Sequence, residues 1–219
     1  MSDELLIEAT ETHEVWRLHR PPRKNALSLS LIAALDAARE AAVARRASVV
    51  VLTGHPPEGT FSSGFDLGDL ARLRDAGASI ETAASPLHAM LGRLESAPFS
   101  LVTAINGPAI GGGVELALLG DVRVMRSSAT LLLPPAKLGI TYPREGLARL
   151  QAALGASLLG AMLATARPVS AARLARAGIV EAHEDPVLEA TRIAIAMASL
   201  SAPARAENRD LLRAVARRS

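Results

Sequence analysis

The sequence contains no cysteine, which excludes disulfide bonds, thiolate catalysis and zinc or iron–sulfur sites built on cysteine ligands. Aromatic side chains make up only 2% of the 219 residues, and the formal net charge is only +2. A nucleic-acid-binding surface needs clustered positive charge and aromatic platforms on which bases stack. We therefore expect no nucleic-acid partner.

The N-terminus also lacks the basic and apolar regions of a secretory signal. The apolar stretch over residues 100–119 is interrupted by Asn106, Pro108, Glu115 and four glycines. A membrane helix needs about 20 apolar residues in succession, so this stretch is expected to be a buried soluble segment. These features predict a cytoplasmic protein that does not bind a membrane.

Hydrophobic patterning predicts an α/β fold. Long Ala, Leu and Arg segments with helical spacing separate four short β-type runs, at residues 15–18, 48–52, 101–105 and 122–125. One helix is expected to begin after Ser28 as N-cap, and another to run from Ser79 to Leu94.

After Pro143 the only strand signal is at residues 179–180, and Ala-rich helical patterns prevail. No internal repeat or low-complexity linker is visible. We expect one continuous unit with a sheet-containing core over residues 1–142 and a helical region over residues 143–219.

The most informative segment runs from Ile105 to Ala117 and reads I-N-G-P-A-I-G-G-G-V-E-L-A. A strand enters a turn, three glycines follow, and an apolar helix begins. Glycines at a helix start expose unpaired backbone N–H groups and let a ligand oxygen approach them, although they also permit close helix–strand packing. Neither the dinucleotide-binding glycine pattern nor the P-loop pattern fits this segment.

Glu115 lies on the first turn of that otherwise apolar helix. A carboxylate among apolar neighbours is costly unless it is paired or functional, and burial raises the pKa of such a group toward the range useful for proton transfer. Glu115 is therefore a candidate acid or base, with a role as helix-dipole partner as the alternative.

A second segment, from Thr60 to Leu67, follows the strand that ends near Gly54. Small residues around Gly64 suggest another exposed backbone donor, and Asp66 is placed to cap the next helix. By itself, this segment is explained equally well as a turn followed by an N-cap.

Together, the two segments resemble the paired oxyanion-hole motifs of the crotonase (enoyl-CoA hydratase/isomerase) superfamily. The run R-P-P-R-K-N-A-L at residues 20–27 is similar to another signature of that family, and residues 167–171 and 177–180 resemble its later landmarks. The resemblance covers residues 5–215. It implies a crotonase-like spiral of ββα units with a helical C-terminal part, an acyl-CoA thioester as substrate, no metal or redox cofactor, and a homotrimer or homohexamer.

The resemblance also implies roles for individual residues. By motif position, the backbone N–H groups of Phe65 and Gly112 would polarise the thioester carbonyl and stabilise an enolate, and Glu115 would position water or transfer a proton. Arg23 or Lys24 would meet a phosphate of the coenzyme, with a solvated side chain as the alternative. Apart from the resemblance, His88 lies on the predicted helix before residue 101, where it either faces the acyl pocket or is a structural or exposed side chain. The residues implied to bind substrate are Lys24, Ala26, Ser63, Gly64, Asp66, Leu67 and Gly111.

Two positions depart from the family pattern. The second catalytic glutamate of typical hydratases is replaced by Pro135, and the glutamate position of some isomerases is occupied by Pro143, two residues before Glu145. Residues 138–143 instead resemble a variant found in methylmalonyl-CoA decarboxylase-like members, in which Tyr142 would orient a carboxylate. A phenol is suited to this because it donates a hydrogen bond at neutral pH.

The leading hypothesis is hydration of a 2-enoyl-CoA by an enzyme of this family. One alternative is a methylmalonyl-CoA decarboxylase-like enzyme, since enolate formation by loss of CO₂ needs no second glutamate. Another is a non-catalytic acyl-CoA-binding accessory protein. The C-terminal helical region is shorter than is usual for the family, so we expect a more open coenzyme site.

Overall fold

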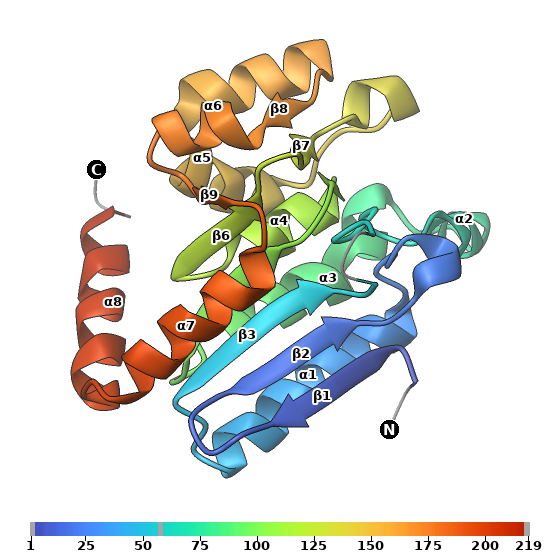
Figure 1. The fold of residues 1–219 in the computed structure, drawn as a ribbon. Helices are drawn as coiled ribbons and strands as arrows, with labels where there is room; N and C mark the ends of the chain where they lie inside the picture. Colours follow the sequence, from blue (N-terminus) through green and yellow to red (C-terminus); the bar gives the residue numbers. More distant parts are fainter. Residues whose placement is uncertain (1–2, 57–58, 217–219) are drawn as a thin grey trace.

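The computed structural model describes residues 3–56 and 59–216. In chain order (Figure 1), its elements are β1 (Leu5–Ala9), β2 (Glu14–Leu18), the 3-10 helix η1 (Pro21–Arg23), α1 (Leu29–Ala44), β3 (Val49–Gly54), α2 (Leu67–Asp75), α3 (Ile80–Glu95), β4 (Ser100–Ile105), β5 (Ala109–Ile110), α4 (Gly112–Leu118), β6 (Val122–Arg126), β7 (Thr130–Leu132), the 3-10 helix η2 (Pro135–Leu138), α5 (Arg144–Thr165), β8 (Val169–Ser170), α6 (Ala171–Arg176), β9 (Glu181–His183), α7 (Pro186–Ala198) and α8 (Ala202–Ala216).

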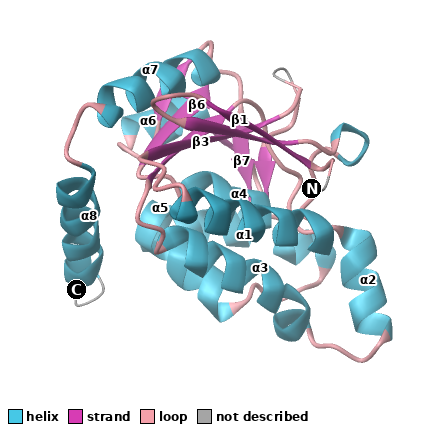
Figure 2. Ribbon diagram, turned by 90° about the horizontal axis from the view of Figure 1, so that it is seen from below, coloured by secondary structure: helices cyan, strands magenta, loops and turns pink. Residues whose placement is uncertain are grey.

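The larger sheet has the strand order β1-β2-β3-β4-β6-β9, and every neighbouring pair is parallel except β1 and β2. Figure 2 shows α7 on one face and α1, α3, α4 and α5 on the other. In β3, Val49 and Val51 belong to the core under α7, whereas Val50 and Leu52 belong to the larger core under the other helices. A strand covered on both faces needs apolar side chains throughout, which explains the unbroken V-V-V-L run.

A smaller sheet of order β5-β7-β8 lies beside the larger one. The units β4-β5-α4 and β6-β7-α5 each place their first strand in the larger sheet and their second in the smaller sheet. An isolated bridge between Ser62 and Ala109 extends the same arrangement to the segment after β3. The chain therefore follows the ββα repeat that the sequence resemblance implies.

The four predicted strands and both predicted helix starts are confirmed. The Ser28 side chain accepts a hydrogen bond from the backbone N–H of Leu31, and Ser79 does the same for Thr82. The sequence predicted a strand at residues 179–180, but the strand lies at Glu181–His183. Strands β1, β5, β7 and β8 were not predicted, because each is short or exposed on one side.

The residues after 142 contribute a strand to the larger sheet as well as helices. Strand β9 pairs with β6 at the edge of the larger sheet, and Ala190 and Ala194 of α7 pack against that sheet. The division of the chain at residue 142 remains a prediction, but the sheet itself extends across it.

One described helix, α5, is long and apolar enough to pass a length-and-composition test for a membrane span, a test that buried helices of soluble proteins also pass. Gly155 interrupts it with φ 72° and ψ 157°. Each of the two parts is therefore shorter than the roughly 20 residues that a bilayer requires. Leu150, Leu154 and Met162 of this helix are buried in the protein core.

Candidate active site

The two glycine-containing turns lie against each other. Gly64 has φ +90°, and a Cβ atom added there would lie 2.5 Å from the carbonyl oxygen of Ile110 and 3.2 Å from the backbone nitrogen of Gly112. A side chain is therefore excluded both by the backbone conformation and by the neighbouring turn. The close approach of the turns requires glycine at this position.

The pairing around Phe65 explains why its N–H group is free. Leu27 and Phe65 form an isolated parallel bridge, in which Leu27 donates to the carbonyl of Gly64 and accepts from the N–H of Asp66. Because backbone groups alternate in direction along an extended segment, the N–H of Phe65 points away from that bridge. Among the described residues it has no hydrogen-bond acceptor.

The second amide belongs to Gly112, the first residue of α4. The N–H groups of the first helical turn have no acceptor within their own helix, and that of Gly112 finds none elsewhere in the described chain. A Cβ atom added at Gly112 would lie 3.6 Å from the backbone nitrogen of Phe65. Two unpaired donors are thus brought together beside a helix N-terminus, where negative charge is stabilised.

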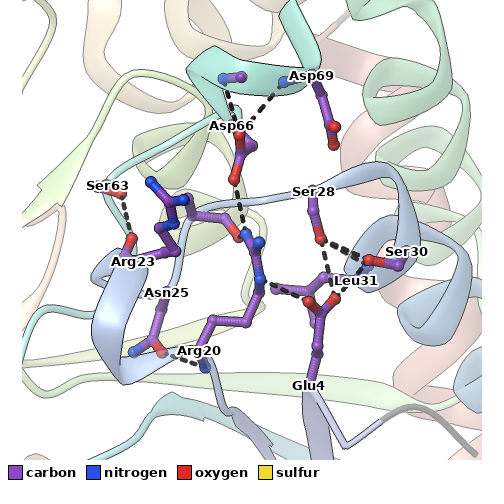
Figure 3. Close-up of polar contacts among 12 residues, drawn as sticks. Glu4, Arg20, Arg23, Asn25, Ser28, Ser30, Leu31, Ser63, Asp66 and Asp69 are labelled. Carbon is purple, nitrogen blue, oxygen red and sulfur yellow. Dashed lines mark hydrogen bonds and ion pairs between the residues drawn. The ribbon is translucent and has the colours of Figure 1, made fainter.

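A polar cluster holds the Phe65 turn in place (Figure 3). The Arg20 guanidinium contacts Glu4 through Nε at 2.7 Å and Asp66 through Nη1 at 2.9 Å, and Nη1 also donates to the carbonyl of Ala26. The backbone N–H of Arg20 donates to the Asn25 side chain at 2.9 Å. The R-P-P-R-K-N-A-L run therefore fixes the position of the Phe65 turn through the contacts of Arg20.

Asp66 fixes the start of α2 as predicted. Its carboxylate accepts hydrogen bonds from the backbone N–H groups of Gly68 and Asp69. Burial alone would raise the pKa of Asp66, but hydrogen bonds from Arg20 and from those two N–H groups outweigh burial and lower it. The carboxylate is therefore already engaged within the protein.

An apolar cavity of about 120 Å³ opens beside the two amides. His88, Glu115 and Tyr142 contribute its titratable side chains. Among the described residues, the rest of the wall is made of the two turns, parts of α2 and α3, and the segment before α5: Ser63, Gly64, Phe65, Leu67, Leu70, Ile80, Ala84, Leu87, Ile110, Gly111, Gly112, Pro134, Pro135, Leu138, Ile140 and Pro143.

Glu115 lies at the bottom of this cavity with 1% of its surface exposed. The Tyr142 hydroxyl donates to Oε1 at 2.7 Å, and Nη1 of Arg149 donates to Oε2 at 3.0 Å. A buried carboxylate needs such compensation, because its charge is taken out of water. The alternative that Glu115 only balances the helix dipole does not account for these two side-chain donors.

Tyr142 is half-buried, and its hydroxyl is directed at this carboxylate. Burial, and then the negative charge and hydrogen-bond acceptance of Glu115, raise its pKa well above the ordinary value of 10.0. The phenol therefore keeps its proton throughout the neutral range and directs it to Glu115.

His88 of α3 has no hydrogen-bond partner for either ring nitrogen among the described residues. Its side chain is buried, and Nδ1 lies 3.4 Å from Oε2 of Glu115, outside hydrogen-bond geometry. Ile80, Ala84 and Leu87 share the same helical face and also line the cavity.

Most residues implied by the family resemblance meet at this cavity. Ser63, Gly64, Phe65, Leu67, Gly111, Gly112, Glu115 and Tyr142 all line it. Lys24, Ala26 and Asp66 do not: Lys24 is exposed, Ala26 is buried, and the Asp66 carboxylate is bonded to Arg20. Pro135 is buried in the cavity wall at the expected position of the second glutamate, whereas Glu145 is exposed on the first turn of α5.

The sequence did not identify Arg149 or Gly146. A Cβ atom at Gly146 would lie 3.0 Å from each carboxylate oxygen of Glu115, so glycine lets α5 approach the carboxylate. Arg149 lies one helical turn further along the same face and reaches Glu115 from there. Arginine is common in this sequence, and no local pattern distinguishes this one.

Within the described ranges, no group of three or more His, Asp or Glu side chains is arranged to hold a metal ion.

The chain belongs to the enoyl-CoA hydratase/isomerase family, whose sequence model matches residues 10–215. It is 34% identical over 178 residues to 2,3-dehydroadipyl-CoA hydratase of Escherichia coli, covering 81% of this chain and 68% of that protein. It is 31% identical over 183 residues to human mitochondrial methylglutaconyl-CoA hydratase, covering 81% of this chain and 53% of that one. The family resemblance inferred from the sequence is thereby confirmed.

Solved structures confirm the crotonase-like fold. Pseudomonas aeruginosa AtuE superimposes with a TM-score of 0.89 at 28% identity, covering 97% of this chain and 83% of that chain. An enoyl-CoA hydratase/carnithine racemase from Magnetospirillum magneticum superimposes with a TM-score of 0.89 at 26% identity, covering 98% and 82%.

Proposed function

We propose that the protein adds water to the double bond of a 2-enoyl-CoA thioester. One observation carries the proposal: the unpaired N–H groups of Phe65 and Gly112 lie beside a cavity that also contains the buried carboxylate of Glu115. A thioester oxygen placed between the two donors would have its acyl chain in the apolar cavity. The double bond would then lie near Glu115.

The two N–H groups stabilise the negative charge that develops on the thioester oxygen. When water adds at C3, the π electrons move toward the thioester, and the oxygen gains charge that the two donors and the N-terminus of α4 stabilise. Removing one donor from such a site in other enzymes lowers the rate by about 10²–10³. These donors are fixed by the backbone, so little reorganisation accompanies the reaction.

Glu115 directs the water. Tyr142 and Arg149 each occupy one lone pair of a different carboxylate oxygen, which fixes the plane of the group. Each oxygen retains a second lone pair with which to accept from water. Glu115 then removes the proton of the water molecule whose oxygen bonds to C3.

The cavity favours an uncharged acyl group. No lysine or arginine among the described residues lines it, and Glu115 already contributes a negative charge. An acyl group with a second carboxylate, such as an adipyl or glutaconyl group, would lose its hydration there without gaining a cation. We therefore propose short apolar 2-enoyl groups as substrates, in contrast to the acyl groups in the names of the two relatives above.

Decarboxylation of a malonyl-type thioester is the second candidate, favoured by Pro135 in place of the second glutamate. The contacts of Tyr142 count against it. Its hydroxyl donates to Glu115, and a substrate carboxylate placed near that bond would meet the negative charge of Glu115.

We also propose the conditions of this reaction. The reaction uses acyl-CoA as substrate, requires no metal or redox cofactor and takes place in the cytoplasm. A homo-oligomer, a trimer or hexamer by family resemblance, is supported by exposed apolar side chains on α7, on α8 and between them, namely Leu188, Ile195, Leu200, Leu211 and Leu212. Light scattering of the purified protein measures the number of subunits.

Mass spectrometry of acyl-CoA products tests the function. The protein is incubated with crotonyl-CoA, a 3-enoyl-CoA and methylmalonyl-CoA. We expect crotonyl-CoA to gain one water molecule. Loss of CO₂ from methylmalonyl-CoA would show that the protein is a decarboxylase and not a hydratase. An unchanged mass with a shifted double bond would indicate an isomerase. Binding of a saturated acyl-CoA without turnover of any thioester would indicate an accessory protein.

A further inference from the structure

The hydration of a 2-enoyl group needs a proton at C2 as well as a base for water. Glu115 is bound on both oxygens, and the second carboxylate position of the family is Pro135. Among the described residues that line the cavity, Ser63, Tyr142 and His88 carry another side-chain proton, and the Ser63 hydroxyl donates its proton to the carbonyl of Arg23. The Tyr142 proton is already donated to Glu115.

His88 has the features that a proton donor requires. Its side chain is 5% exposed, it lines the cavity, and neither ring nitrogen has a hydrogen-bond partner in the described part of the chain, although Nδ1 lies 3.4 Å from Oε2 of Glu115. A buried polar group without a partner is costly, so a structural histidine normally finds one. The five histidines include a buried counterexample in His13, whose Nδ1 lies within hydrogen-bond distance of Thr10 and Thr12.

We propose that His88 is the second acid/base group of the site and supplies the proton to C2. This inference rests on the proposed hydration. The water oxygen bonds to C3 while its proton passes to Glu115, and the electron pair of the double bond enters the enolate. As that pair takes the Nε2 proton of His88 and forms the new C2–H bond, Nδ1 takes up a proton from Glu115, so the imidazole stays neutral throughout.

The position of Nδ1 completes the transfer. Nδ1 lies 3.4 Å from Oε2 of Glu115, and a rotation of the imidazole into hydrogen-bond geometry lets it receive the proton that Glu115 took from water. The carboxylate is then ionised again, and the imidazole is neutral with its proton on Nδ1, from which it returns to its first tautomer before the next turnover. The sum of these steps is the addition of one water molecule.

Steady-state kinetics of two variants provide the first test. His88→Gln and His88→Leu should lower kcat for crotonyl-CoA by about 10²-fold or more and change KM by less than about 3-fold. The matched control is His13→Gln, which alters a buried histidine outside the cavity and should retain wild-type kcat. A kcat for both His88 variants within about 3-fold of wild type overturns the inference, and so does an effect confined to KM.

Chemical rescue separates proton transfer from packing. His88→Ala leaves space for free imidazole, which should restore at least 10-fold of the lost kcat, whereas imidazole should not restore Glu115→Gln. Absence of rescue in a folded His88→Ala variant that binds a saturated acyl-CoA overturns the inference.

Nitrogen NMR of the wild-type protein requires no substitution. With ¹⁵N-labelled histidine, a saturated acyl-CoA should shift the resonances of one imidazole, because His88 alone of the described histidines lines the cavity. Binding with no such shift overturns the role of His88. If the wild type binds acyl-CoA but hydrates no enoyl thioester, the proposed function fails instead, and this inference fails with it.

Discussion

Nη1 of Arg149 lies 3.0 Å from Oε2 of Glu115, which joins the second turn of α5 to the only acidic side chain in the wall of the acyl cavity among the described residues. The side chains are 16% and 2% exposed, respectively. Because both groups are shielded from water, each charge is compensated mainly by the other. Removing one of them should therefore lower the free energy of unfolding more than breaking an ion pair on the surface does.

Arg149→Leu should lower the free energy of unfolding by about 3–5 kcal/mol, because it leaves the Glu115 carboxylate buried without its cation. Urea unfolding monitored by circular dichroism measures this loss. Adding Glu115→Gln to Arg149→Leu should recover part of it, since the amide carries no charge. The control is Arg93→Leu, which breaks a half-exposed pair with Asp36 and should cost about 0–1 kcal/mol. Equal costs for the two single variants would contradict a buried-charge penalty.

Glu115→Gln should lower kcat for hydration by about 10²-fold or more and leave the affinity for a saturated acyl-CoA nearly unchanged. The amide fits the same space but cannot accept the proton of water. Loss of the enoyl-thioester absorbance measures turnover, and calorimetry measures binding. Glu145→Gln, which alters an exposed carboxylate of α5, should behave as wild type. If the two variants exchanged these behaviours, Glu145 would be the base.

The raised pKa of Tyr142 predicts a stability that falls at alkaline pH. The unfolded phenol loses its proton near pH 10, whereas the folded phenol retains it to a higher pH. Above pH 10 the folded state therefore binds more protons, and the free energy of unfolding decreases as pH rises. Tyr142 is the only tyrosine, so absorbance near 295 nm reports its ionisation alone. Tyr142→Phe should remove this part of the pH dependence, and a wild-type phenol that titrates near pH 10 would refute it.

Gly64→Ala should destabilise the protein and abolish most hydration. The left-handed conformation alone costs an alanine about 1–2 kcal/mol, and the Cβ atom would also contact the Ile110 carbonyl at 2.5 Å. Moving that carbonyl displaces the Gly112 amide. Gly160→Ala is the control: it lies in α5 with no atom within 4 Å of the added Cβ and should raise stability by up to about 1 kcal/mol. Retained kcat in a folded Gly64→Ala variant would show that the spacing of the turns is not critical.

The backbone part of the site could be predicted because it is encoded locally. The two glycine-containing turns each precede a helix, and Glu115 is conspicuous among apolar neighbours, whereas the family resemblance implies that the donors are Phe65 and Gly112. The side chains around Glu115 could not be predicted in this way, since His88 and Arg149 come from two other helices. Their contact depends on how α3 and α5 pack around α4, which periodicity within one segment does not specify.

The fold shows the same limit. The buried strands β3 and β4 were predicted because both of their faces require apolar side chains. Strand β9 reads Glu-Ala-His and is largely exposed, so its composition does not indicate a strand. It forms because β6 provides a parallel edge to which its backbone can bond.

The pairing of β9 with β6 has a consequence for biosynthesis. A chain still emerging from the ribosome presents β6 as an open edge until residues 181–183 arrive, some 55 residues later. A truncation after residue 142 would leave that edge open permanently and would also remove α7, so the apolar face of Val49, Val51 and Val102 would lose its cover. Such a fragment is expected to associate through the bare strand and to aggregate, so completion of the larger sheet depends on residues 181–198.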